Sequence, residues 1–107
     1  MSEKYDEVIK KLSEVASQVF PSKEGKVFLY GSRARGEAHK DSDWDILVIT
    51  QHEANSQDAY DKYVFPFAQI GWDLDEEIIP INYSEEEWAK RKNSLFYRNV
   101  MQDALQL

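Results

Sequence analysis

The stretch GSRARGEAHKDSDWDILV, Gly31 to Val48, decides the fold of this chain. It follows an apolar run, residues 27–30, that predicts a short β-strand ending at Gly31. A residue without Cβ permits a turn there and lets the backbone approach a ligand closely. If a helical turn follows, its free N–H groups and the hydroxyl of Ser32 favour an anion.

Two arginines follow the turn. The guanidinium groups of Arg33 and Arg35 suit a phosphate, because they offer paired donors in a fixed fork. The alternative is a surface ion pair with Glu37 or Glu53. We therefore interpret Arg33 and Arg35 as nucleotide-binding candidates and keep the ion pair as the competing interpretation.

The second half of the stretch pairs two carboxylates. Asp43 and Asp45 stand two residues apart at the start of an apolar run, residues 46–49, that is typical of a strand buried on both faces. Alternation points both carboxylates to one face, where they repel each other unless a cation neutralises them. Mg²⁺ or Mn²⁺ prefers such oxygen ligands, and Mg²⁺ takes its other ligands from water and phosphates.

The eighteen residues resemble the signature of the nucleotidyltransferase superfamily of DNA polymerase β type, and in particular its minimal nucleotidyltransferase branch. The resemblance implies an α+β fold with a small mixed β-sheet flanked by helices. It implies transfer of a nucleoside monophosphate from a nucleoside triphosphate, expected to be ATP, to a hydroxyl group with two metal ions. By it, Gly31 and Ser32 match the Gly-Ser that holds the β- and γ-phosphates, and Asp43 and Asp45 match the metal-binding aspartates.

The resemblance requires a third carboxylate on a later strand. We predict a hairpin with arms 72–75 and 78–83, in which Asp73 and Asp75 share one face by alternation. Asp73 is the first choice for catalysis and metal binding because it lies between apolar neighbours, and Asp75 is the runner-up. The alternative for both is the polar outer face of an edge hairpin.

The rest of the chain predicts helices around this sheet. An amphipathic helix is expected over residues 3–20, and a second over 55–67, ended or kinked by its proline. Ser84 and Glu87 form a capping box that predicts the start of another helix. The last helix is expected over 94–105, with apolar surface available to a partner.

Composition restricts the function. The chain has 107 residues, with 13 Lys plus Arg against 20 Asp plus Glu, a net charge of −7. The length predicts a single domain over 1–107, and the charge makes nucleic acid an unsuitable partner. There is no cysteine, no apolar signal core and no membrane-length run, so we expect no membrane association and a cytoplasmic protein.

Three hypotheses remain open. The chain nucleotidylates a partner protein, as the antitoxin of a toxin–antitoxin pair whose toxin is helical. Alternatively, it modifies a small hydroxylated molecule, with a homo-oligomer completing the acceptor pocket. The third hypothesis is a noncatalytic nucleotide-binding or interaction module that keeps the fold.

Overall fold

The computed structural model describes residues 3–52 and 54–107. Its helices and strands are interspersed along the chain. They are α1 (Glu3–Val19), β1 (Lys26–Tyr30), α2 (Ser32–Arg35), β2 (Trp44–Thr50), α3 (Gln57–Ala59), the π-helical turn η1 (Tyr60–Val64), α4 (Phe65–Leu74), β3 (Ile78–Ser84), α5 (Glu85–Ala89), α6 (Leu95–Asp103) and β4 (Leu105–Gln106).

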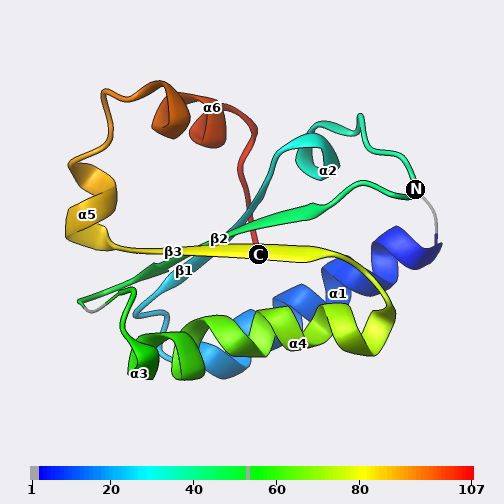
Figure 1. The fold of residues 1–107 in the computed structure, drawn as a ribbon, viewed down its shortest axis with the longest axis horizontal. Helices are drawn as coiled ribbons and strands as arrows, with labels where there is room; N and C mark the ends of the chain where they lie inside the picture. Colours follow the sequence, from blue (N-terminus) through cyan, green and yellow to red (C-terminus); the bar gives the residue numbers. More distant parts are fainter. Residues whose placement is uncertain (1–2, 53) are drawn as a thin grey trace.

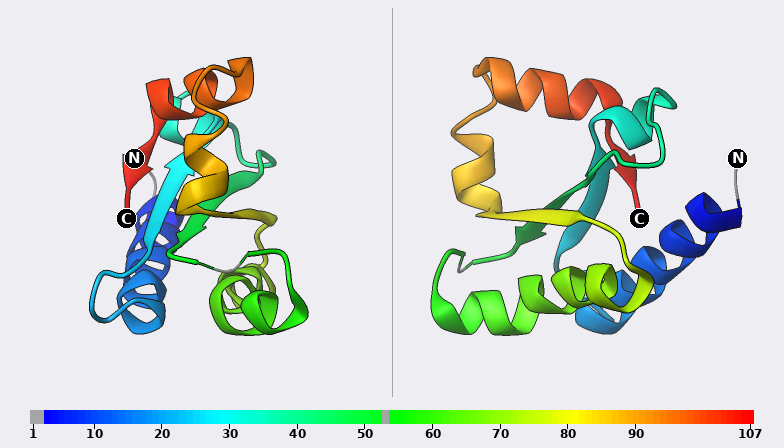
Figure 2. Two further views of the ribbon diagram at one scale, coloured as in Figure 1. Left: turned by 90° about the vertical axis from the view of Figure 1, so that its left-hand side faces the viewer. Right: turned by 45° about the vertical axis from the view of Figure 1, so that its right-hand side comes forward.

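The strands form one mixed sheet in the order β3-β2-β1-β4. β1 is antiparallel to both β2 and β4, whereas β2 and β3 are parallel. Helices α1 and α4 lie on one side of the sheet, and α5 and α6 lie on the other (Figures 1 and 2). This architecture confirms the predicted α+β fold with a small mixed sheet flanked by helices.

The α1 and α4 side of the sheet holds the larger core. Val8, Leu12, Val15 and Ala16 are buried on α1, with the three- and four-residue spacing of an amphipathic helix. They pack with the residues of β2 that point to this side, such as Ile46. The predicted first helix is therefore confirmed, and its apolar stripe is core.

The segment after β2 remains helical much further than predicted. The Phe65 backbone N–H donates to the Tyr60 carbonyl, the five-residue spacing of a π turn. Pro66, which has no N–H to donate, follows at the start of α4. The turn accommodates the proline, so the chain stays helical from Gln57 to Leu74.

The hairpin predicted over 72–83 is wrong in its first arm. Residues 72–74 are the last turn of α4, and Asp75 adopts the left-handed conformation that ends the helix, its N–H donating to the Gly71 carbonyl. The apolar residues Phe67 and Ile70 continue at helical spacing and bury against the sheet, which outweighs the short alternation after them. A Cβ on Gly71 would lie 2.5 Å from the Glu76 carbonyl oxygen, so glycine permits this close return of the chain.

The capping box is present at the start of α5. The Ser84 hydroxyl accepts from the Glu87 N–H at 3.1 Å, and the Glu87 carboxylate accepts from the Ser84 N–H at 3.1 Å. Within residues 3–52 and 54–107, no helix combines the length and apolar character needed to cross a bilayer.

Candidate functional site

The glycine turn and the second aspartate touch each other. Gly31 ends β1 with φ +78°, a conformation that strongly favours glycine, and Tyr30 just before it pairs with Asp45 across the sheet. A Cβ on Gly31 would overlap Oδ2 of Asp45. The absence of a side chain at position 31 therefore makes room for the Asp45 carboxylate.

Asp43 and Asp45 form an acidic pair at the start of β2. Asp45 belongs to the strand and is partly buried, whereas Asp43 is exposed just before it. Burial raises the pKa of Asp45, the neighbouring Asp43 raises it further, and the Arg35 guanidinium opposes both effects. The structure thus brings together Gly31, Asp43, Asp45 and Arg35.

Arg35 is already engaged by two carboxylates. Its Nη1 donates to Oδ2 of Asp103 at 2.9 Å, and its Nε donates to Oε2 of Glu37 at 3.2 Å. Asp103 is the last residue of α6, so this ion pair connects α6 to α2. The predicted alternative for Arg35, pairing with Glu37, is therefore present in this structure.

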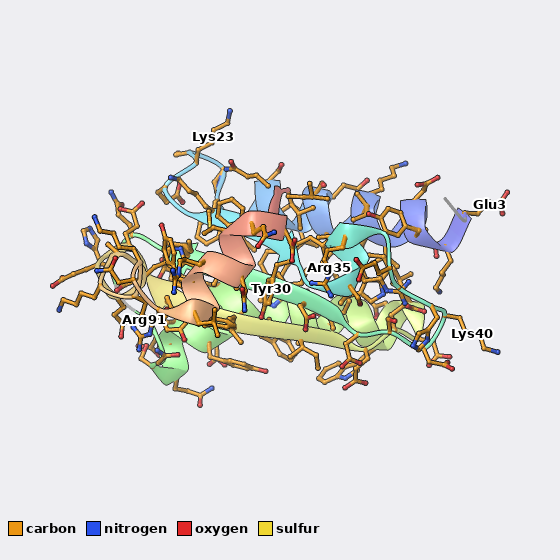
Figure 3. All side chains as sticks on the ribbon, turned by 90° about the horizontal axis from the view of Figure 1, so that it is seen from above. Glu3, Lys23, Tyr30, Arg35, Lys40 and Arg91 are labelled. Atoms are coloured by element: carbon orange, nitrogen blue, oxygen red, sulfur yellow. The ribbon has the colours of Figure 1, made fainter. Side chains whose placement is uncertain are left out.

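Tyr30 lies beside the acidic pair. Burial raises the pKa of Tyr30 to about 12, with smaller contributions from Asp45 and Tyr83. Its ring meets Phe96 of α6 edge-on, with centroids 6.2 Å apart. Figure 3, viewed from the α6 side, shows Tyr30 and Arg35 near the middle of this face. The Tyr30 hydroxyl is therefore neutral near pH 7 and able to donate a hydrogen bond.

Arg33 lies elsewhere. Its guanidinium stacks on Trp44, 4.4 Å from the ring centroid, and its Nη2 donates to the Ser42 carbonyl at 2.8 Å. The same Nη2 lies 3.7 Å from Oε1 of Glu76. Trp44 packs in the α1 and α4 core, so Arg33 secures the linker on the side of the sheet opposite Asp45.

Asp73 and Asp75 do not join the acidic pair. Asp73 is exposed on α4 and lines a surface hollow with Lys11 and Val15 of α1. This places it on the α1 and α4 side, across the sheet from Asp45. Asp75 is exposed at the left-handed end of the same helix. The expectation that a strand carries either residue to the first two aspartates fails because residues 72–74 are helical.

The strand beside Asp45 presents apolar side chains instead. Ile79 of β3 pairs with Asp45, and Ile81 and Tyr83 follow on the same face. Glu77 stands one residue before β3, and its carbonyl accepts from the Trp44 N–H at 2.8 Å. Strand alternation extended by one residue indicates the same face for Glu77 as for Ile79.

Sequence reasoning missed both Glu77 and Asp103. Glu77 could have been found from its position one residue before β3 and two before Ile79. The wrong hairpin prediction put it in a turn instead. Asp103 lies 68 residues from Arg35, and no local sequence pattern predicts the ion pair between them. Among the described residues, no three His, Cys, Asp or Glu side chains group closely enough to hold a metal.

Comparisons with known proteins identify the family and the fold of this chain. The chain matches the nucleotidyltransferase domain family over residues 9–101. No curated protein sequence matches it significantly. One similar structure, a toxin–antitoxin with AMP-PNP, is 18% identical with a TM-score of 0.57, covering 87% of this chain and 69% of that one.

A second similar structure comes from a Sulfolobus solfataricus protein assigned as a nucleotidyltransferase. It is 22% identical with a TM-score of 0.50, covering 99% of this chain and 87% of that one. At such identities the two structures establish a shared fold. The family match spans most of the chain, from α1 to α6. The chain therefore belongs to the nucleotidyltransferase domain family.

Proposed function

We propose that this chain binds a magnesium nucleoside triphosphate at Gly31, Ser32, Asp43 and Asp45, and transfers the nucleoside monophosphate to a hydroxyl group. The observation that carries the proposal is the contact between Gly31 and Asp45. A glycine turn lies against a carboxylate there, and this supports a site for phosphates and the metal that accompanies them.

The residues present fit one Mg²⁺ or Mn²⁺ ion. Asp43 and Asp45 supply two carboxylates, and Mg²⁺ commonly uses one or two from the protein with the rest from water and phosphate. Their repulsion, one cause of the raised pKa of Asp45, would be relieved by a divalent cation. When bound, the ion would neutralise charge on the phosphates.

The chain's own residues would position the substrate. The backbone at Gly31 and Ser32 would approach the terminal phosphates, and Arg35 would add positive charge after exchanging Asp103 for phosphate. The acceptor hydroxyl oxygen would bond to the α-phosphorus as the bond to the β-phosphate bridging oxygen breaks, so pyrophosphate leaves. Glu77, the exposed carboxylate just before β3, would take the hydroxyl proton and release it to solvent.

The acceptor is proposed to be a hydroxyl on a partner protein, and the nucleotide to be ATP. Support comes from the similar fold of the toxin–antitoxin solved with AMP-PNP. The net charge of −7 also disfavours nucleic acid as the acceptor. An antitoxin acting on its helical toxin satisfies both observations.

Calorimetric titration of Mg²⁺–ATP tests the site. We expect saturable binding to the wild type, and at least about tenfold weaker binding to Asp43→Asn and Asp45→Asn, because each loses a metal ligand. Asp73→Asn and Asp41→Asn serve as matched controls that should bind normally. Equal binding by Asp45→Asn, or loss of binding in Asp73→Asn, would contradict the assignment.

Transfer is tested separately with ATP labelled on the α-phosphate and a coexpressed candidate partner. Label on the partner, lost in Asp45→Asn and weakened in Glu77→Gln, is the expected result.

The apolar face of β3 favours a second function, nucleotide binding without transfer, since Ile79 stands where a strand carboxylate would face Asp45. Binding with no label on any acceptor would support that second function.

A further inference from the structure

Three aromatic rings follow one another on the outside of the helical segment formed by α3, η1 and α4. They belong to Tyr60, Phe65 and Trp72, with ring centroids 6.3 Å apart for the first pair and 5.6 Å for the second. Tyr60 is 43% exposed and Trp72 is 72% exposed, the largest value for a big apolar side chain among the described residues. We call these three residues the aromatic stripe.

The π turn aligns the stripe. Positions five residues apart stand on different sides of an α-helix, which has about 3.6 residues per turn. The bond from the Phe65 N–H to the Tyr60 carbonyl widens the turn and brings these two side chains onto one side. Trp72 follows seven residues later, nearly two whole α-helical turns, and so continues the same line.

The aromatic stripe is separate from the aromatic residues that this segment buries in the core. Phe67 of the same segment is fully buried, and Tyr63 stacks on Phe20 with centroids 5.4 Å apart. The segment therefore buries one face and leaves a second aromatic face in water. Apolar surface left in water gains none of the free energy of burial, and contiguous exposed apolar patches mark interaction sites.

Charge identifies the occupant. Two exposed acids lie next to the stripe by helical spacing, Asp61 four residues before Phe65 and Asp75 three residues after Trp72. A second copy would bring the same acidic segment and be repelled. A basic segment would be attracted, and its cations could lie over the rings. The chain already forms such contacts, with Arg91 4.5 Å from the ring centroid of Tyr83 and Lys62 5.2 Å from that of Tyr63.

We infer that the aromatic stripe binds a basic amphipathic helix of a partner protein, with apolar side chains packed on Phe65 and lysine or arginine side chains over Tyr60 and Trp72. The inference concerns binding and does not depend on nucleotidyl transfer. The stripe runs along α4 toward the turn that leads to Glu77, so a docked partner would lie near the end of the sheet that carries Asp43.

A synthetic helical peptide of Leu and Lys tests this surface, with a Leu and Glu peptide of the same spacing as control. Trp44 and Trp88 are buried, so a blue shift of tryptophan emission on binding reports on Trp72. We expect the basic peptide alone to give this shift. In calorimetry, Trp72→Ser and Tyr60→Ser should each weaken binding about five- to tenfold.

Leu95→Ser is the matched control, because Leu95 is 66% exposed on α6, away from the stripe. It should bind the basic peptide as the wild type does, and so should Asp45→Asn, which separates this test from the nucleotide site. Equal binding of the acidic peptide, or a loss in Leu95→Ser as large as in Trp72→Ser, would overturn the inference. So would a wild-type dimer in sedimentation that Trp72→Ser dissociates, since the occupant would then be a second copy.

Discussion

The two faces of the sheet differ in how much they bury. On the α1 and α4 side, thirteen buried apolar residues of the described ranges form one cluster, including Leu12, Ile46 and Phe67. On the α5 and α6 side, the cluster has four buried members, Leu47, Ile49, Trp88 and Val100. Because side chains alternate along β2, one strand contributes to the large core and carries Asp45 on the other side. Most of the buried apolar core and the proposed site therefore lie on opposite faces of the sheet.

The largest effect is expected in the large core. Phe67→Ala should lower the free energy of unfolding by about 3–5 kcal/mol, because it leaves a cavity beneath the sheet. Urea denaturation followed by circular dichroism measures this change. Val100→Ala on the thinner side should cost clearly less. Equal losses would show that the two faces share the stability.

Gly31→Ala tests the close contact between the turn at the end of β1 and the Asp45 carboxylate. It should destabilise the protein by about 2–3 kcal/mol, through the positive φ and the overlap with Asp45. Gly36→Ala is its control, since Gly36 has φ +75° and nothing within 4 Å of an added Cβ, so only the conformational cost of about 1 kcal/mol applies. Thermal unfolding compares them. If both variants lose the same stability, the Asp45 carboxylate moves aside easily.

A smaller effect is expected at the start of α5. Ser84→Ala should cost about 1 kcal/mol by removing the cap. Hydrogen bonds from the Ser84 backbone and side chain lower the pKa of Glu87 below its usual 4.5. The contribution of Glu87 is therefore complete above pH 4.5 and lost as pH falls through its folded-state pKa. Unfolding of Glu87→Gln at several pH values should differ from the wild type at neutral pH and converge with it in acid.

The smallest expected effect on stability is a gain, not a loss. Asp45→Asn should raise the melting temperature by about 1–3 °C at pH 7, because the ionised carboxylate is disfavoured by burial and by Asp43. A raised folded-state pKa means that the penalty is present above that pKa and disappears below the ordinary value of 3.8. The gain measured by calorimetric scanning should vanish in acid. A variant less stable than the wild type at pH 7 would indicate that Asp45 holds the turn together.

Much of the fold was predictable from patterns within one element. The helix stripe of α1, the strand ending at Gly31 and the capping box at Ser84 each repeat a known periodicity or spacing. The strand predicted at Trp72–Leu74 was wrong, because three or four residues with alternating polarity fit both a strand and the end of a helix. Gly71 was the one local indication that a helix ends here, since its lack of Cβ permits the chain to turn back toward the sheet.

The site was only partly predictable. The pattern placed Asp43 and Asp45 on one face because their spacing is local. Arg33 and Arg35 are two residues apart, yet one stacks on Trp44 and the other pairs with Asp103. Those contacts depend on residues from distant elements, which a single sequence does not position.

At the proposed nucleotide site, the ion pair between Arg35 and Asp103 determines how the affinity for a triphosphate should respond to salt. A triphosphate that takes the Arg35 guanidinium replaces one anion by another, so the measured affinity is a difference between two attractions. Added salt weakens both, and the two losses partly cancel. We expect the logarithm of the affinity to fall less steeply with salt in the wild type than in Asp103→Asn, where the guanidinium begins with one fewer carboxylate partner.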